Sequence, residues 1–295
     1  MPKLKVKRPE RPEASISALL NLEAPQTRAA AQPRAVGAVE LTVKSRAPSS
    51  VIGALRQQGS LKLLFPRSAT DNLTAVLLNT AGGVTGGDRF STQIEAKAHT
   101  DVTVTTQAAE RAYRAQEGET GHIETKIDLA PDARMAWLPQ ETLLYDQAAL
   151  DRTLSIRMER TSTLLAVEPV VFGRAAMGER LDRLHFRDRI DVVRDGTLIF
   201  ADRTIIDGRA ADQMTRAALG NGAGAMASVI YAAPAAARFL AAARERLPKS
   251  CGISALHEDL LYARLLAQDS FALRQILIPL VALLNAHPLP RPWTI

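Results

Sequence analysis

The sequence predicts a mainly β protein, a single β-rich domain with two helices near its C-terminus. Three observations support this fold class. From about residue 36 to residue 230, apolar residues alternate with polar or small ones, which is the period of a half-buried strand. Turn-forming residues separate these runs at intervals of about ten residues, a spacing typical of all-β domains. Helical periodicity is found only toward the end of the chain.

Alternation identifies the strands in order along the chain. The clearest runs are Val39, Leu41 and Val43; Val102 and Val104; Ile123 to Leu129; and Leu154, Ile156 and Met158. Asp195-Gly196 predicts a two-residue hairpin turn, because such a turn needs positive φ and these residues tolerate it. Residues 260–266 are too few and too uniformly apolar for periodicity to distinguish helix from strand, so both alternatives stay open.

Two segments predict the C-terminal helices. The first runs from Pro234 to Leu247 and contains an alanine-rich stretch with high helix propensity. The second runs from Phe271 to Leu284, where apolar residues recur on one face. Ser270 is the expected N-cap of this helix, and Pro279 is a site at which it can kink.

Residues 1–35 differ in composition from the rest of the chain. They contain five prolines and seven Lys or Arg against three Glu, so they hold a surplus of four positive charges out of the chain's net +6. Such a segment has little apolar surface to offset the entropy of ordering, and we expect a disordered basic arm with a short helical stretch at residues 14–22. Residues 36–295 would form the β-rich domain, since neither a repeat nor a linker interrupts them.

Composition also restricts the functional class. Outside the arm, basic and acidic residues are interleaved, which argues against nucleic-acid binding. No apolar run reaches the roughly 20 residues of a membrane helix, and the N-terminus lacks the apolar core of a secretory signal. Cys251 is the only cysteine, so an intrachain disulfide is impossible. We therefore expect a cytoplasmic protein.

A glycine-rich loop follows the strand-like run that begins at residue 73. Its sequence is Asn79-Thr-Ala-Gly-Gly-Val-Thr-Gly-Gly-Asp88. A Walker loop requires Gly-Lys-Ser/Thr, but here Asp88 follows Gly87, and the paired glycines do not fit the dinucleotide fingerprint. We interpret the loop as a tight corner that uses the conformational freedom of glycine. A second glycine cluster, residues 220–224, predicts a flexible turn.

The side chains that carry chemistry are sparse. The five histidines show no metal-ligand spacing, and no nucleophile motif is present. Six acids lie in or beside apolar or glycine-containing segments, namely Asp88, Glu110, Glu141, Asp146, Glu168 and Glu179. For any one of them, an ordinary solvated or salt-bridged carboxylate is the common role.

Five sequence motifs together resemble one known family. They are the glycine-rich loop; Thr105-Thr-Gln-Ala-Ala-Glu-Arg-Ala-Tyr113; Trp137-Leu-Pro-Gln-Glu-Thr142 with Asp146; Phe172-Gly-Arg-Ala-Ala-Met-Gly-Glu179; and Leu289-Pro-Arg-Pro-Trp293. In order and spacing, from residue 38 to residue 293, they resemble the urease accessory proteins of the UreD family, also called UreH. Each motif alone would be weak evidence, but five in order are specific.

The resemblance implies a mainly β fold with helices near the C-terminus and no enzymatic activity. Family members act with UreF and the GTPase UreG on apo-urease, and they are thought to carry a nickel passage. The resemblance thus implies no tightly bound cofactor and only transient Ni²⁺, whose candidate ligands here are Asp88, Glu141, Asp146, Glu168 and Glu179. Phe271 and Trp293 are the candidate contacts with UreF, because aromatics near a terminus often anchor interfaces.

Two alternatives to a nickel-loading role remain open at this point. One is an enzyme on a β scaffold that uses Asp88, Glu141 or Glu179 as a general acid or base. The other is a protein-binding module without a metal role.

Overall fold

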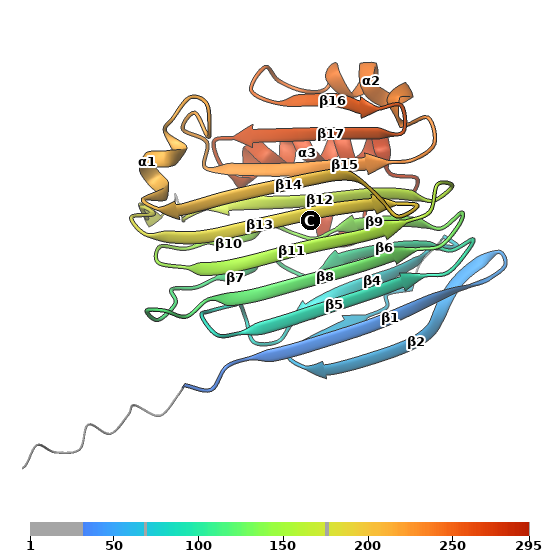
Figure 1. Cartoon of the computed structure of the whole chain (residues 1–295), viewed down its shortest axis with the longest axis horizontal. Coiled ribbons are helices and arrows are strands. Elements are labelled where there is room, and N and C mark those ends of the chain that lie inside the picture. Colours follow the sequence, from blue (N-terminus) through green and yellow to red (C-terminus); the bar gives the residue numbers. More distant parts are fainter. Residues whose placement is uncertain (1–31, 68–69, 175–176, 295) are drawn as a thin grey trace, which may run out of the picture. The chain divides into compact units, whose positions relative to one another are not determined.

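Two β-sheets make up most of the chain in the computed structural model, which describes residues 32–67, 70–174 and 177–294 (Figure 1). The predicted arm, residues 1–35 with its helical stretch at residues 14–22, lies almost wholly outside these residues. From Arg34 onward the chain forms one compact unit. Within the described residues, one sheet has seven strands and the other has ten.

Sheet A is the seven-stranded sheet. Its strands, in spatial order, are β14 (Thr197–Gly208), β13 (Leu184–Arg194), β11 (Ala149–Met158), β8 (Gly121–Leu129), β5 (Arg89–Ala96), β1 (Val36–Arg46) and β2 (Ser49–Gly59).

Sheet B is the ten-stranded sheet. Its main path runs through β16 (Gly252–His257), β17 (Leu260–Ala267), β15 (Ala225–Ala232), β12 (Thr163–Phe172), β9 (Arg134–Leu138), β6 (Asp101–Thr106), β4 (Leu73–Asn79) and β3 (Leu61–Leu64). Two short strands lie off this path, because β10 (Thr142–Leu144) pairs with β12 and β7 (Glu110–Ala112) pairs with β10.

The central part of the chain is a β-solenoid. From β4 to β13 the chain passes between the two sheets, and each strand pairs in parallel with the equivalent strand of the next coil. The parallel register stacks apolar side chains at the same level of successive coils. One such column contains Leu41, Ile94, Ile127, Ile156 and Val192, all of which are buried. The alternation in the sequence therefore marks the inward side of each coil.

The predicted strands and the predicted hairpin are confirmed. Asp195 and Gly196 adopt φ of 46° and 78°, and they join β13 to its antiparallel partner β14. The glycine-rich loop is a turn between β4 and β5, and Asn221 with Gly222 forms a second turn at positive φ. The segment that periodicity left open is β17, an antiparallel strand between β15 and β16.

The helix predictions are correct in position and partly wrong in detail. Helix α3 (Ser270–Leu284) contains Pro279, and its N-cap is Asp269 rather than Ser270, because the Asp269 carboxylate accepts a hydrogen bond from the Ala272 N–H at 2.8 Å. The alanine-rich segment forms only a 3₁₀ turn, Ala236–Phe239, and the short helix α2 (Leu240–Arg244), since Ala235 at φ 55° breaks the start of the predicted helix.

Two hydrophobic cores result from this arrangement. The first fills the interior between the two sheets. The second lies between the outer face of sheet B and α3 (Figure 1). Strand β12 is buried on both faces, with Leu164 and Ala166 in the first core and Leu165 and Val167 in the second. This explains its almost uninterrupted apolar sequence.

Three smaller elements complete the described chain. They are the helix α1 (Ala210–Met214), which the sequence did not predict, the 3₁₀ turn just mentioned, and a last 3₁₀ turn, Arg291–Trp293. Within the described residues, no helix is both long enough and apolar enough to cross a membrane.

Candidate functional site

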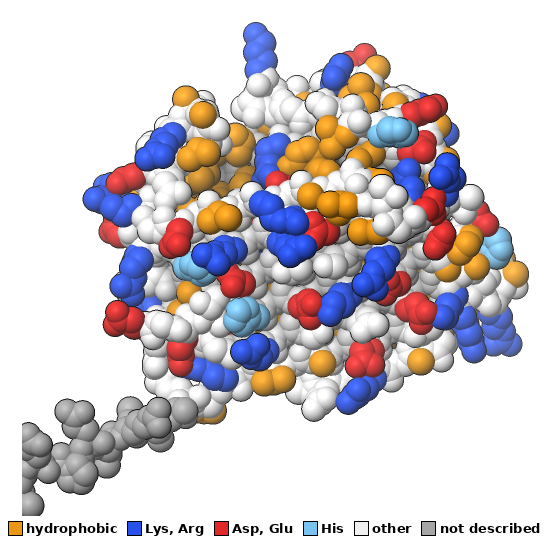
Figure 2. Space-filling view, viewed as in Figure 1, with side chains coloured by type: hydrophobic (Ala, Val, Ile, Leu, Met, Phe, Trp, Pro, Cys, Tyr) orange, Lys and Arg blue, Asp and Glu red, His pale blue; other side chains and the backbone are white. Residues whose placement is uncertain are grey.

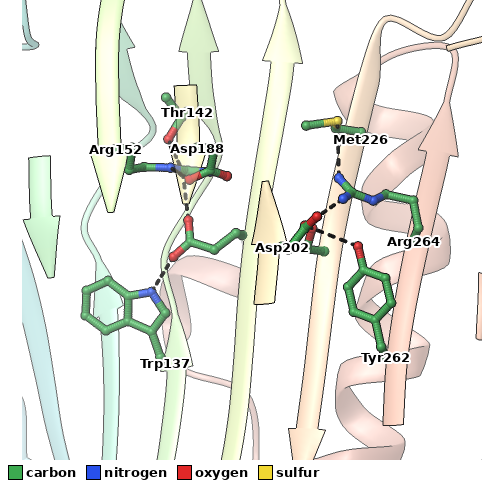
Figure 3. A network of polar contacts seen from close by, with 10 residues as sticks. Trp137, Thr142, Arg152, Asp188, Asp202, Met226, Tyr262 and Arg264 are labelled. Atoms are coloured by element: carbon green, nitrogen blue, oxygen red, sulfur yellow. Dashed lines mark hydrogen bonds and ion pairs between the residues drawn. The ribbon is translucent and has the colours of Figure 1, made fainter. Parts of the chain in front are cut away.

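A buried cluster of charged side chains lies in the interior of the solenoid. Arg152 on β11 donates from Nε to Asp188 Oδ1 at 2.9 Å and from Nη1 to Thr142 at 3.0 Å (Figure 3). The same Nη1 lies 2.7 Å from Glu168 Oε2, and the indole of Trp137 donates to the other oxygen of Glu168 at 2.7 Å. These residues are on neighbouring coils, so the stacking of the solenoid brings them together.

The charges in this cluster do not balance formally, because one guanidinium faces two carboxylates. Burial raises the pKa of Glu168, and the nearby Asp188 raises it further, whereas Arg152 and the Trp137 N–H oppose the change. Burial would lower the pKa of Arg152, but the charges of Asp188 and Glu168 raise it instead. The guanidinium therefore stays charged beside two acidic side chains in the interior.

Glu168 and Arg152 line a cavity of about 70 Å³ between the two sheets, together with the indole of Trp137. A second pocket of about 120 Å³ includes the exposed residues Ala108 and Arg111. The residues that line both hollows are Leu61, Leu77, Thr106 and Glu110. The interior cavity and the outer pocket therefore adjoin at these residues, and Glu110 is the only acid among them.

Glu110 is the carboxylate at this junction. The Asn79 amide donates to both of its oxygens, at 3.1 and 3.2 Å, and no described residue forms a salt bridge with it. Burial raises the pKa of Glu110, which the neutral Asn79 and the backbone N–H of Arg111 oppose only in part. In the sequence Glu110 is one of six acids in or beside apolar or glycine-containing segments, but it is not among the predicted metal ligands. Its proximity to Asn79, where the glycine loop begins, was not visible in the sequence.

Gln140 also lines the interior cavity. Its amide oxygen accepts from Arg274 at 2.8 Å, which leaves the buried Nε2 group without an acceptor among the described residues. A buried donor without a partner costs about 1–3 kcal/mol, so an occupant of the cavity that accepts a hydrogen bond would be favoured.

The Asp88 carboxylate binds backbone groups at the glycine-rich corner. Its two carboxylate oxygens accept from the backbone N–H groups of Ala35 at 2.7 Å and Thr85 at 2.9 Å. These bonds fasten the glycine-rich corner to the start of β1. Gly87 at φ 85° lies against the side chain of Arg34, where a Cβ would be 2.9 Å from the arginine Cδ. Glycine is favoured there because a φ of 85° lies in the left-handed region, which residues with a Cβ rarely adopt.

Asp146 and Glu179 share a second corner. Glu179 accepts from the Asp146 N–H at 3.2 Å and from Nε of Arg174 at 3.0 Å, while Asp146 accepts from the Arg183 N–H at 3.0 Å. The hydrogen bond from Arg174 holds the pKa of Glu179 below its usual value. Burial alone would raise the pKa of Asp146, but its hydrogen bonds outweigh this and lower it.

The five predicted nickel ligands therefore do not meet at one site, and only Asp146 and Glu179 share a corner. Glu168 alone among them lines the interior cavity. Glu141 accepts from Ser270 at 3.1 Å and pairs with Arg274 at 3.4 Å, so it is oriented toward α3. Over the parts of the chain that the structure describes, no group of three or more His, Cys, Asp or Glu side chains is arranged to hold a metal ion.

The two predicted partner contacts differ in exposure. Phe271, in the first turn of α3, is 72% exposed. Trp293 is buried against α3, and its indole donates to the Leu138 carbonyl at 2.9 Å. The expectation that Trp293 lies on an exposed terminus is therefore not met, because the last 3₁₀ turn folds it into the second core.

Comparison with known proteins gives one consistent result. The family model described as UreD urease accessory protein matches residues 35–294. Urease accessory protein UreD of Ruegeria pomeroyi is 51% identical over 257 residues, which cover 87% of this chain and 100% of that protein. The UreD proteins of Roseobacter denitrificans and Rhizobium leguminosarum bv. viciae are 48% and 41% identical, and each match covers 89% of this chain and 96% of the relative. The chain therefore belongs to the UreD urease accessory protein family.

Proposed function

We propose that this protein helps to load nickel into apo-urease together with UreF and the GTPase UreG. As a UreD protein it is an accessory protein of urease maturation and not an enzyme. The observation that carries the nickel part of the proposal is the interior cavity, which Glu168 and Glu110 line together with threonines and apolar side chains. Nickel is the cargo in this proposal.

The chemistry of the cavity suits a cargo ion. Ni²⁺ accepts carboxylate and water ligands, and an ion that must be released requires few protein ligands. Carboxylates that line a passage also lower the electrostatic barrier to a divalent ion. Glu168 and Glu110 both line the cavity, and Glu110 also lines the outer pocket, so an ion that entered there would meet Glu110 first.

We rank Glu168 first among the five carboxylates predicted from the sequence. The other four are engaged elsewhere: Asp88, Asp146 and Glu179 accept backbone N–H groups at loop corners, and Glu141 binds groups of α3. Replacing any of these four should disturb the local fold, and nickel loading should fall only as a consequence of that disturbance.

A reconstitution tests this role of Glu168. Purified protein with UreF, UreG, GTP, Ni²⁺ and apo-urease should yield active urease, and Glu168→Gln should lower the nickel content while the complex still assembles. Glutamine keeps an acceptor for the Trp137 indole but removes the charge. The matched control is Glu124→Gln, because Glu124 is an exposed carboxylate on β8 that pairs with Lys126.

A protein-binding module without a metal role is the competing function. It is favoured by the fact that each of the five predicted carboxylates already has a partner within the protein. Normal nickel content in urease activated by an intact Glu168→Gln complex would support this function. If both nickel loading and assembly fail, Glu168 has a structural role.

We also propose that Phe271 contributes to the surface that meets UreF. Its exposed ring, in the first turn of a helix whose other side packs in the second core, supports this assignment. Phe271→Ala should weaken UreF binding without lowering the melting temperature, whereas Trp293→Ala should lower the melting temperature. Unchanged UreF affinity in Phe271→Ala would remove Phe271 from the interface.

A further inference from the structure

Strand β14 leaves one edge of sheet A open. Within the described residues it pairs only with β13, as the last strand of the sheet (Figure 1). In an antiparallel pair the backbone N–H and C=O groups of alternate residues point away from the partner strand. A strand of 12 residues with such an edge is a template for another strand unless a charge, a proline or a cover protects it.

An apolar groove of about 350 Å³ runs along this edge. Its apolar lining comes from five elements: Ile205 and Ile206 of β14, Met214 of α1, Leu219 of the turn after α1, Met226 of β15 and Leu266 of β17. Ile205 is 63% exposed and Leu219 is 54% exposed. Figure 2 shows apolar side chains gathered on this face beside α1.

The surroundings of the groove contain more arginines than acids, and the one acid of β14 that has no Arg or Lys partner is Asp207, which lies beside His185. Arg203 and Arg264 line it and pair with Asp191 and Asp202. Two further arginines add unbalanced charge. Arg187 lies opposite Ile205 in the strand register, and Arg216 lies in the turn between groove residues Met214 and Leu219. Both are exposed, and neither forms an ion pair with any described residue.

We propose that the β14 edge and its groove bind an extended acidic segment of a partner protein, which adds to sheet A as a further strand. The open edge supplies backbone hydrogen bonds except at Asp207, whose carbonyl already accepts from the Gln213 side chain of α1, and side chains at alternate positions of the segment enter the groove. Acidic side chains on the segment face Arg187 and Arg216. This site is independent of the nickel cavity, because the two share no lining residue.

The probe is a fluorescein-labelled peptide in which valine and glutamate alternate, added to the full-length protein. The anisotropy should rise to saturation, binding should weaken as salt increases, and amide exchange should slow across Thr197–Gly208. A peptide with a central proline, which lacks one backbone donor, should bind less tightly. A peptide with lysine in place of glutamate should also bind less tightly than the valine–glutamate peptide.

Two variants of matched chemistry make the test specific. Ile205→Lys should weaken peptide binding by about tenfold, since it replaces an apolar side chain of the groove with a charged one. Leu198→Lys should leave binding unchanged, because Leu198 is on the same strand and 55% exposed but does not line the groove. If Ile205→Lys does not fold, Leu219→Asp in the turn replaces it, with the same loss expected.

The proposal is overturned if the peptide does not bind, or if the proline peptide binds equally well. It is also overturned if Leu198→Lys weakens binding as much as Ile205→Lys. None of these results depends on nickel loading, so they leave the function proposed above unaffected.

Discussion

The interior cavity and the loop corners both contain buried or half-buried carboxylates, but in contrasting settings. At the corners, Asp146 and Glu179 accept hydrogen bonds from backbone amides and arginine, and their pKa values are lowered. In the interior, burial raises the pKa values of Glu110 and Glu168. The environment of the corner carboxylates therefore favours their ionised form, whereas burial in the interior disfavours the ionised form of Glu110 and Glu168. A bound cation would offset this penalty, which makes the interior pair the better candidates for a cation site.

The largest effect should come from Arg152→Ala. This substitution leaves Glu168 and Asp188 buried without their cation, and we expect the free energy of unfolding to fall by about 3–5 kcal/mol. Urea denaturation followed by tryptophan fluorescence measures it. Arg157→Ala, at an exposed position on the same strand, should change stability by less than about 0.5 kcal/mol. A loss below about 1 kcal/mol for Arg152→Ala would mean that the interior cluster is not desolvated as described.

Asp88→Ala should have the next largest effect. It removes the acceptor of two backbone N–H groups, and we expect a loss of about 2 kcal/mol in the free energy of unfolding. Asp88→Asn should lose less, because its amide oxygen still accepts one of the two bonds. Thermal unfolding of both variants measures the series. Equal stability of the alanine variant and the wild type would exclude a structural role for this corner.

Glu110→Gln should act in the opposite direction. The variant no longer holds an uncompensated buried charge, and we expect it to be more stable than the wild type at pH 7 by up to about 1 kcal/mol. A raised pKa in the folded state means that stability is gained as the pH falls through that pKa toward the ordinary value of 4.5. The advantage of the variant should therefore shrink on acidification. If Glu110→Gln is less stable than the wild type at pH 7, the carboxylate has a stabilising partner.

Glu179→Gln should produce the smallest effect, with the reverse pH dependence. Because the pKa of Glu179 is lowered in the folded state, its carboxylate stabilises the fold at pH values above 4.5. This contribution to the free energy of unfolding is lost as the pH falls through the folded-state pKa. The stability difference between wild type and variant should thus be constant from pH 7 to about pH 5 and vanish at lower pH. Urea titrations at a series of pH values test this. A difference that grows on acidification would contradict the assignment.

Much of the fold could be predicted from alternation, because each coil buries one side of its strands. Val39, Leu41 and Val43 are all buried as expected. The solenoid itself was not predictable from this pattern. A period of two predicts which side chains of a strand point inward, but it does not predict which strands pair with one another. In this fold, consecutive strands lie mostly in different sheets. Strand β17 was ambiguous for a related reason, since its alternate residues enter two different cores.

The site was harder to predict than the fold. In the sequence, Asp88 and Glu168 look alike, as acids beside apolar or glycine-rich runs. The difference between them is made by long-range pairing: Asp88 meets Ala35, which is 53 positions away, and Glu168 meets Trp137, which is 31 positions away. Glu110 was not selected because its environment is created by Asn79 at the end of another strand. Spacing along the chain carries no information about such contacts.

Strand β12 separates the two cores, and this position makes it a shared wall. Glu168 is directed from it into the interior cavity, while the adjacent Val167 packs in the core beneath α3. The packing beneath α3 and the lining of the interior cavity are therefore one residue apart along the chain.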